Sequence, residues 1–182
     1  MASRQVALLR GINVGRANRV AMADLRALFE TMGYIDVRTL LNSGNVVFTS
    51  LRAAPIAATA RIEEAIAARL RVSTRVTVLT AEEFAVIVTR NPLLKVADEP
   101  SRLLVAVLAD PADRPRLNPM LKQRWAPEAL AIGPRAAYLW CPRGVLASPL
   151  WEAVGRLLGD AVTSRTWATM IKLHSLIEST SP

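Results

Sequence analysis

The fold is decided by residues 6–49, which read VALLRGINVGRANRVAMADLRALFETMGYIDVRTLLNSGNVVFT. A short apolar run at 6–9 precedes a loop with two glycines, and apolar residues then recur at helical spacing until Gly33. Two strand-like runs follow at 36–41 and 45–49, and the Ser43-Gly44 pair between them is typical of a tight hairpin. The stretch therefore predicts a strand, a loop, a helix and a hairpin in that order.

The rest of the chain continues and then repeats this order. A helical stripe ending at Leu70 and a β-branched run at 75–80 complete a βαββαβ series, and Thr80 with Glu83 forms a predicted capping box for a short bridging helix. The elements expected after that helix are a strand at 103–109, a weak helix at 112–125 that is broken by Pro115 and Pro119, a hairpin at 129–132 and 137–140, a helix capped by Ser148, a short strand at 162–165 and a helix at 167–178.

This repetition predicts an α+β fold of two tandem ferredoxin-like (βαββαβ) subdomains plus a C-terminal helix. We place the first subdomain and its bridging helix at 1–90, a polar, proline-bounded connector at 91–101, and the second subdomain with the C-terminal helix at 102–182. Several strands are apolar throughout instead of alternating, so both sheet faces are expected to be covered. The cover would come from the other subdomain and neighbouring elements, or from a second copy of the chain.

Composition removes several classes of protein. With 182 residues, 52% of them hydrophobic, the chain can build one ordinary core or two small ones without disulfides or metals. One Cys and one His exclude an intrachain disulfide and a histidine-rich metal site. We predict no cofactor, no metal and no recognisable catalytic residue. Since no apolar run reaches the roughly 18 residues of a membrane helix and no signal peptide precedes the first strand, we expect a cytoplasmic protein without membrane contact.

The charge predicts a negatively charged partner. The net charge is +8, and the first twenty residues carry four arginines and no acidic residue. A positive surface attracts phosphates, so a phosphorylated small molecule or a nucleic acid is the expected partner. Codon usage in a GC-rich genome is the alternative explanation for the abundance of arginine.

The loop after the first strand is the main candidate site. Glycines permit unusual backbone angles, so several N–H groups can converge on one anion beside a helix N-terminus, with arginines supplying charge. The loop lacks the pattern of a Walker A motif or of a dinucleotide fingerprint. The candidate residues in it are Arg10, Gly11, Asn13, Gly15, Arg16, Asn18 and Arg19. The alternative is that the glycines only form the turn and the arginines only aid solubility.

The hairpin turn is expected at the same end of the sheet as this loop, about one strand spacing of 5 Å away. Asn42, Ser43 and Asn45 would add donors and acceptors there, although these are also ordinary hairpin residues. A secondary candidate is Arg165, Thr166 and Trp167, because an arginine before a helix can meet a phosphate. A plain helix cap with a buried tryptophan explains that segment equally well.

Three further features favour packing over function. Tyr138 and Trp140 alternate onto one strand face, as in RNA-stacking platforms, but the surrounding signature is absent, so we expect core packing. His174 shares an apolar helical stripe and is expected to pack there, and Cys141 lacks the arginine spacing of a phosphatase loop.

Five blocks of the sequence stand out together: LLRGINVGRANRVAMADLRALFETMGY, VRTLLNSGNVVF, NPL, YLWCPRG and SRTWATMIKL. With these blocks, the chain resembles the bacterial domain-of-unknown-function 1697 family. The resemblance implies two ferredoxin-like subdomains and no established reaction, cofactor or partner. The family positions present here are Arg10, Gly11, Asn13, Gly15, Met22, Ser43, Gly44, Asn45, Arg165 and Trp167. The chain departs from the family at 145–149, where a Gly- and Lys-containing turn is common, and at Thr166, where Asn is common.

Three functions agree with these observations. The first is a binding module for a phosphorylated ligand, nucleotide or nucleic acid that uses the basic loop and the hairpin turn. The second is an enzyme acting on a small phosphorylated or carboxylated metabolite, for which no general base can be named. The third is a self-associating interaction protein, in which a homodimer covers the apolar strands.

Overall fold

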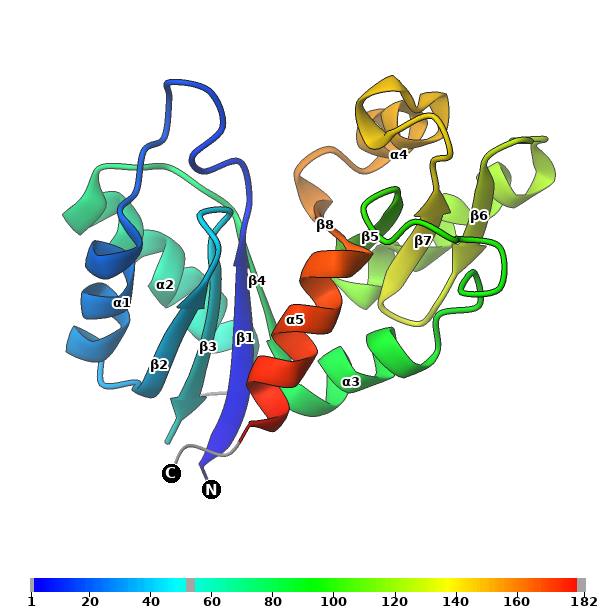
Figure 1. Cartoon of the computed structure of the whole chain (residues 1–182). Coiled ribbons are helices and arrows are strands. Elements are labelled where there is room, and N and C mark those ends of the chain that lie inside the picture. Colours follow the sequence, from blue (N-terminus) through cyan, green and yellow to red (C-terminus); the bar gives the residue numbers. More distant parts are fainter. Residues whose placement is uncertain (1, 52–54, 180–182) are drawn as a thin grey trace. The chain divides into compact units, whose positions relative to one another are not determined.

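The computed structural model describes residues 2–51 and 55–179 and divides into two compact units (Figure 1). One unit contains the chain up to Phe84 together with the chain from Leu173, and the other is Ala85–Lys172. The chain from Leu173 thus groups with the first unit, whereas the sequence-based limits place it at the end of the second subdomain. Among the described residues, no helix is both long and apolar enough to cross a membrane.

The first unit contains a four-stranded antiparallel sheet in the order β2-β3-β1-β4. Its elements are β1 (Ser3–Leu9), α1 (Met22–Thr31), β2 (Ile35–Leu40), β3 (Asn45–Ser50), α2 (Pro55–Leu70) and β4 (Val76–Thr80). Leu8 of β1 pairs with Asn45 of β3, and the Leu9 N–H donates to the Gly44 carbonyl at 2.8 Å. The end of β1, where the candidate loop begins, therefore lies beside the β2–β3 turn, as predicted.

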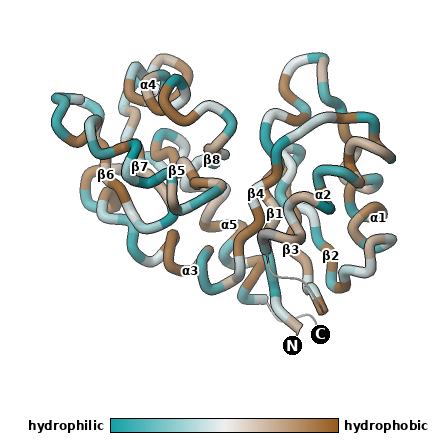
Figure 2. The backbone as a smooth tube through the Cα atoms, turned by 180° about the vertical axis from the view of Figure 1, so that it is seen from behind, coloured by the Kyte–Doolittle hydropathy of each residue, from teal (hydrophilic) through white to brown (hydrophobic). Residues whose placement is uncertain are grey.

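Both faces of this sheet are buried. One face packs with α1 and α2 around a cluster of Phe29, Tyr34 and Phe48, whose ring centroids lie 4.6–5.7 Å apart. The opposite face carries Val6 and Leu8, which are fully buried, and the Arg4 guanidinium donates there to the Ile177 carbonyl. The unbroken apolar runs of the strands follow from this burial on both sides, and Figure 2 shows the hydrophobic colour following strands such as β4.

The second unit has a four-stranded antiparallel sheet in the order β6-β7-β5-β8. Its strands are β5 (Leu103–Leu108), β6 (Ala129–Ile132), β7 (Ala136–Trp140) and β8 (Val162–Thr166). The other elements are α3 (Ala81–Thr89) and α5 (Trp167–Glu178), which cross the unit limits, η1 (Pro111–Lys122), η2 (Val145–Ala147), α4 (Pro149–Leu158) and η3 (Gly159–Ala161).

The segment expected to be a helix at 112–125 is instead a 3₁₀ segment, η1. Pro115 and Pro119 lie inside it, and each lacks an N–H and clashes with the carbonyl four residues earlier in an α-helix. The sheet face beside η1 and α4 forms a second core that contains Leu104, Ala106 and Val154.

Two predicted helix starts are confirmed in atomic detail. The Thr80 N–H donates to Glu83 Oε2 at 2.9 Å and the Glu83 N–H donates to Thr80 Oγ1 at 3.0 Å, which is a reciprocal capping box. Ser148 Oγ accepts from the Trp151 N–H at 2.9 Å and caps α4, with a proline in its first turn.

Candidate functional site

The loop between β1 and α1 takes its shape from residues with left-handed backbone angles. Gly11 and Gly15 have φ values of +67° and +64°, and Asn13 and Asn18 have φ values of 54° and 51°. Glycine and asparagine are the residues that adopt this conformation most readily. The Asn13 N–H donates to the Asn18 carbonyl at 2.9 Å and closes the loop on itself.

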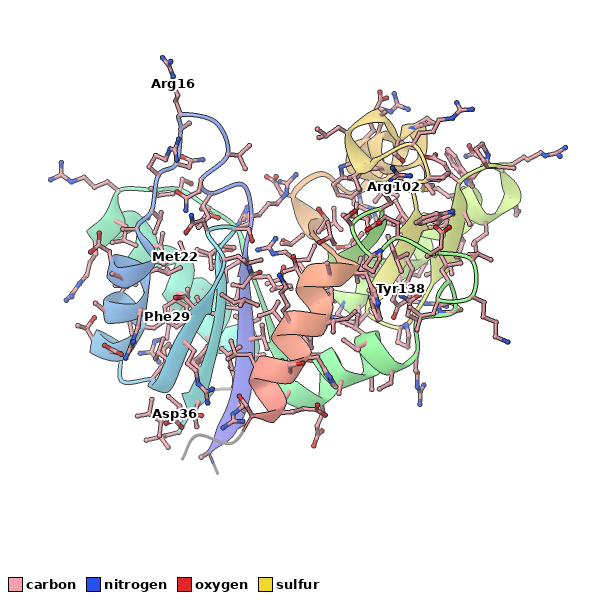
Figure 3. All side chains as sticks on the ribbon, viewed as in Figure 1. Arg16, Met22, Phe29, Asp36, Arg102 and Tyr138 are labelled. Carbon is pink, nitrogen blue, oxygen red and sulfur yellow. The ribbon has the colours of Figure 1, made fainter. Side chains whose placement is uncertain are left out.

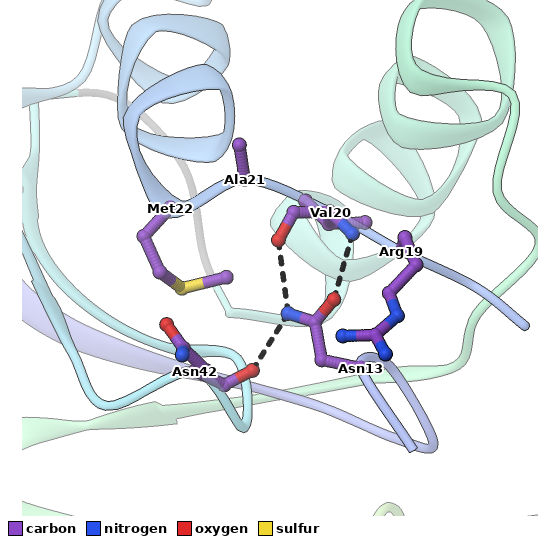
Figure 4. Close-up of a pocket in the computed structure, with 6 residues that line it drawn as sticks. All are labelled: Asn13, Arg19, Val20, Ala21, Met22 and Asn42. Carbon is purple, nitrogen blue, oxygen red and sulfur yellow. Dashed lines mark hydrogen bonds between the residues drawn. The ribbon is translucent and has the colours of Figure 1, made fainter. Parts of the chain in front are cut away.

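The Asn13 side chain holds the loop in place. Its Nδ2 donates to the carbonyl of Val20 at 2.9 Å and to that of Asn42 at 2.8 Å, and its Oδ1 accepts from the Val20 N–H at 2.8 Å (Figure 4). Both donors of this amide are thus used within the protein. The structure corrects the expectation that Asn13 offers donors to an anion, because its side chain joins the loop, the hairpin turn and the approach to α1.

Asn45 and Ser43 also differ from their predicted role. Asn45 is fully buried, and its Nδ2 donates to the Leu40 carbonyl at 2.7 Å and to Ser43 Oγ at 2.9 Å. These bonds stabilise the turn itself. A Cβ added to Gly44 would lie 2.7 Å from Ile12 Cδ1, so the turn and the loop approach each other closely at this glycine. The pair Asn45 and Ser43 positions the site and does not line it.

A pocket of about 380 Å³ lies where the loop, the turn and the start of α1 meet. We call it the Asn13 pocket, and the described residues that line it are Asn13, Arg19, Val20, Ala21, Met22 and Asn42. Figure 4 shows Arg19 and Asn42 on either side of Asn13, with Ala21 and Met22 at the beginning of α1. Three of the ten loop and turn candidates, Asn13, Arg19 and Asn42, thus line one pocket.

The start of α1 adds positive potential to this pocket. The first hydrogen bond within the helix runs from the Leu25 N–H to the Ala21 carbonyl, and Ala21 has no side-chain oxygen with which to cap the helix. The N–H groups of the first turn and the helix dipole favour an anion there. Asp24, also in this turn, brings a carboxylate to the same helix end but lies outside the pocket lining.

The remaining loop candidates do not converge on the pocket. Arg16 stands at the loop tip and points away from the rest of the unit (Figure 3). Arg10 is half-buried. Its N–H donates to the Arg75 carbonyl at 2.9 Å, and its carbonyl accepts from Thr74 Oγ1 at 2.7 Å. Gly11, Gly15 and Asn18 shape the loop without lining the pocket. Arg10 and Arg16 therefore do not join Arg19 in the lining of the Asn13 pocket.

Sequence reasoning missed Val20, Ala21 and Met22 as pocket residues. An available signal was the alanine before α1, because a helix that starts without Ser, Thr, Asp or Asn leaves its first N–H groups uncapped. The apolar character of the three residues concealed their position.

In the secondary candidate at 165–167, Arg165 and Trp167 are buried and Thr166 is half-buried. Arg165 is only 8% exposed, its Nη1 donates to the Ser164 carbonyl at 2.8 Å, and burial lowers the pKa of its guanidinium to about 10. Thr166 Oγ1 accepts from the Thr169 N–H at 3.4 Å, and Trp167 is buried. The structure therefore supports the alternative of a capped helix with a buried tryptophan and contradicts a phosphate site at Arg165.

The three features assigned to packing are buried or paired. Tyr138 has no exposed surface, its hydroxyl donates to the Ile87 carbonyl at 2.7 Å, and burial raises its pKa to about 12. Burial also raises the pKa of the Cys141 thiol, which disfavours the reactive thiolate. His174 stacks on Phe84 with ring centroids 6.5 Å apart, and its Nδ1 lies 3.5 Å from Glu178 Oε2.

In the described part of the chain, no group of three or more His, Cys, Asp or Glu residues is placed to hold a metal ion. The molecule is an α+β protein with two four-stranded antiparallel sheets and a pocket between the β1–α1 loop and the β2–β3 turn of the first. The chain belongs to a family of proteins of unknown function, DUF1697, whose model matches residues 2–138 and so includes the Asn13 pocket.

The fold is shared with a solved structure. The conserved bacterial protein SP0830 from Streptococcus pneumoniae matches with a TM-score of 0.74 over 98% of this chain and 100% of that chain. The two sequences are 21% identical, which shows a common fold alone. A comparison with curated proteins finds no match.

Proposed function

We propose that this chain binds a small phosphorylated ligand, with the phosphate group held in the Asn13 pocket. The observation that carries the proposal is the joint presence of the Arg19 guanidinium, the Asn42 amide and the uncapped start of α1 at one pocket. A guanidinium and helix N–H groups are the donors that bind phosphate most strongly in proteins. The Asn13 hydrogen bonds support the proposal because they fix the backbone of Asn42 and of Val20, which follows Arg19 in the chain, before a ligand arrives.

A small molecule is favoured over a nucleic acid by the pocket's size and charge. Its volume of about 380 Å³ lies at the lower end of the range for small-molecule sites, roughly 300–1,000 Å³. Arg19 is the one basic side chain among the described residues that line it. A nucleic acid would engage several phosphates along a basic surface, whereas Arg16 and Arg10 do not join Arg19 at the pocket.

Binding is favoured over catalysis by the chemistry of the lining. Among the described lining residues, none has a carboxylate, imidazole or thiol that could exchange protons near neutral pH. The groups present can hold a negative charge and orient it.

For the fold, we propose that the two units are tandem ferredoxin-like subdomains. The support is the βαββαβ order of the first unit and the common order of the two sheets, in which the first strand of each unit lies between the third and the fourth. Since η1 replaces the first helix of the second unit, that unit would be a modified copy.

The test is a titration with inorganic phosphate followed by backbone amide NMR. We expect the amide signals of Ala23 and Asp24 to shift, because they belong to the first turn of α1. Arg19→Ala should weaken binding by about tenfold or more, since a hydrogen bond between charged groups contributes about 1.5–3 kcal/mol. Arg16→Ala is the matched control from the same loop, and it should change the affinity by less than about threefold, in line with an exposed charge.

Two results would contradict the proposal. Equal losses in Arg16→Ala and Arg19→Ala would mean that diffuse charge attracts phosphate without a defined pocket. Binding to single- or double-stranded DNA with a steep dependence on salt, and no shift at Ala23, would assign the basic loop to nucleic acid.

A further inference from the structure

A second pocket, of about 300 Å³, lies between α1 and α2 of the first unit. We call it the helix groove. Leu28 and Met32 line it from the end of α1, and Arg61, Ala65 and Arg69 line it from α2. Figures 1 and 2 both show the two helices side by side. Among the described residues the groove shares no lining residue with the Asn13 pocket, so it is a separate candidate site.

The inner part of the helix groove is apolar. Leu28 is buried in the core of the first unit, and Met32 and Ala65 are half-buried and pack against that core. Because the buried residues of a surface pocket form its deepest part, these side chains make an apolar floor. A hydrocarbon group placed on this floor leaves water, which is favourable.

The outer part of the groove carries charge. Arg61, Glu64 and Arg69 belong to the lining and are exposed. Arg69 Nη1 donates to Thr31 Oγ1 at 3.5 Å, which brings this guanidinium from α2 to the end of α1. Two positive charges and one negative charge give the lining a net charge of +1.

The two arginines of the groove lack the ion pairs that similar arginines make. Arg26 of α1 pairs with Glu30 at 2.9 Å, one turn further along its helix. Within the part of the chain that the structure describes, Arg61 and Arg69 have no acidic partner, although Glu64 lies one turn from Arg61. Their guanidinium groups therefore keep donors for an anion from outside the chain.

We propose that the helix groove binds an amphipathic monocarboxylate, with its carboxylate at the two arginines and its hydrocarbon chain on the apolar floor. A guanidinium holds a carboxylate through two parallel hydrogen bonds. One carboxylate also balances the net charge of the lining, whereas a phosphate monoester carries about −1.5 to −2 at neutral pH. This site is independent of the proposed phosphate pocket and adds a second class of ligand.

The experiment titrates the protein with butyrate, hexanoate, octanoate and octylammonium by calorimetry. The three carboxylates have the same charged group and differ in chain length, so their affinities report the apolar floor. We expect the affinity to rise at least about twofold with each added methylene group. Octylammonium has the same chain length as octanoate and the opposite charge, so it should bind at least about tenfold more weakly.

Backbone amide NMR with octanoate locates the site. The signals of Thr31, Ala65 and Ala68 should shift, because these residues line the helix groove. The signals of Ala23 and Asp24, in the first turn of α1, should stay in place.

Variants of exposed residues test the charged rim without disturbing the core. Arg61→Ala and Arg69→Ala should each lower the affinity for octanoate about threefold, and the double variant about tenfold. Glu64→Gln removes the negative charge of the lining and should raise the affinity about twofold. Arg26→Ala is the matched control and should leave it unchanged, since Arg26 pairs with Glu30 and lies outside the lining. Alanine favours the helix, and circular dichroism checks that each variant is folded.

Four results would each overturn this inference. They are an affinity that does not depend on chain length, equal binding of octanoate and octylammonium, an unchanged affinity in the Arg61→Ala, Arg69→Ala double variant, and shifts confined to Ala23 and Asp24. The last would assign the carboxylate to the Asn13 pocket. Binding of inorganic phosphate is measured separately, so the proposed function and this inference fail independently.

Discussion

Gly44 shows how one residue connects the hairpin turn to the candidate loop. Its φ is +81°, and an added Cβ would lie 2.7 Å from Ile12 Cδ1 and 2.8 Å from Leu9 Cβ. The Leu9 Cβ cannot rotate away, because it is fixed to the backbone of β1. The glycine therefore allows the turn to approach the loop closely enough for the hydrogen bond between Asn13 and Asn42.

Gly44→Ala should destabilise the protein by about 2–4 kcal/mol, from backbone strain and overpacking together. Gly33→Ala is the matched control, since Gly33 has a similar φ of +87° but no atom within 4 Å of the added Cβ. The control should lose only about 1 kcal/mol, from strain alone. Urea denaturation of the two variants measures the difference, and equal losses would show that the contact with Ile12 and Leu9 has no energetic weight.

Tyr138 makes the stability depend on alkaline pH. Burial raises its pKa from 10.0 to about 12, so between these values the folded state keeps a proton that the unfolded state releases. The stability contribution is therefore complete below pH 10 and is lost as the pH rises toward 12. Relative to Tyr138→Phe, the natural protein should lose roughly 2–3 kcal/mol over this interval.

Denaturant titrations of both proteins at several pH values between 8 and 12 test this, because all other titrating groups are common to the two. At pH 8 the natural protein should be the more stable one, since the variant leaves the Ile87 carbonyl without the Tyr138 hydroxyl. If the free energies of unfolding of the two proteins changed with pH in parallel, a buried, neutral tyrosine in the folded state would be contradicted.

At the scale of elements, capping residues determine where a helix starts, and prolines determine whether a segment forms an α-helix or a 3₁₀ helix. The Thr80–Glu83 box and the Ser148 cap form where the sequence predicts them, because each depends on residues within three positions of one another. The weak helix expected at 112–125, broken by Pro115 and Pro119, is a 3₁₀ segment for an equally local reason, since each proline prevents a regular α-helix there.

Thr80→Ala should lower the free energy of unfolding by about 1 kcal/mol, because Thr80 Oγ1 accepts from the Glu83 N–H at the start of α3. Glu82→Ala is the control, as it removes a carboxylate from the same turn and leaves the box intact. Thermal unfolding followed by circular dichroism compares the two. A larger loss in Glu82→Ala would show that charge at this helix end matters more than the capping bonds.

At the scale of the whole molecule, the net charge of +8 is a poor guide to the site. Arginines hold carbonyls at several places, such as Arg4 at Ile177, Arg116 at Leu157 and Arg135 at Leu108. Arg165 is buried. A basic composition therefore reflects structural arginines as well as surface charge, and only Arg19 among the loop arginines lines the pocket.

The sequence by itself determined the elements and their order. The signals that define an element extend over only a few positions in the chain: the spacing of hydrophobic residues, glycines, prolines and capping residues. Strands such as Asn45–Ser50 and helices such as Trp167–Glu178 could therefore be placed from local patterns. The family membership, which the model match over residues 2–138 shows, was also present in the sequence blocks.

The tertiary structure decided which polar residues can meet a ligand. Asn13 and Asn45 look like binding residues in a sequence, but in the folded chain the Asn13 amide donates to the carbonyls of Val20 and Asn42, and the Asn45 amide donates to the Leu40 carbonyl and to Ser43 Oγ. Arg165 looks like a phosphate ligand, but folding buries it. Met22 and Ala21 look like ordinary helix residues until the turn and the loop meet at the start of α1. Residue type sets which bonds a side chain can make, and the folded chain sets which partners it reaches first.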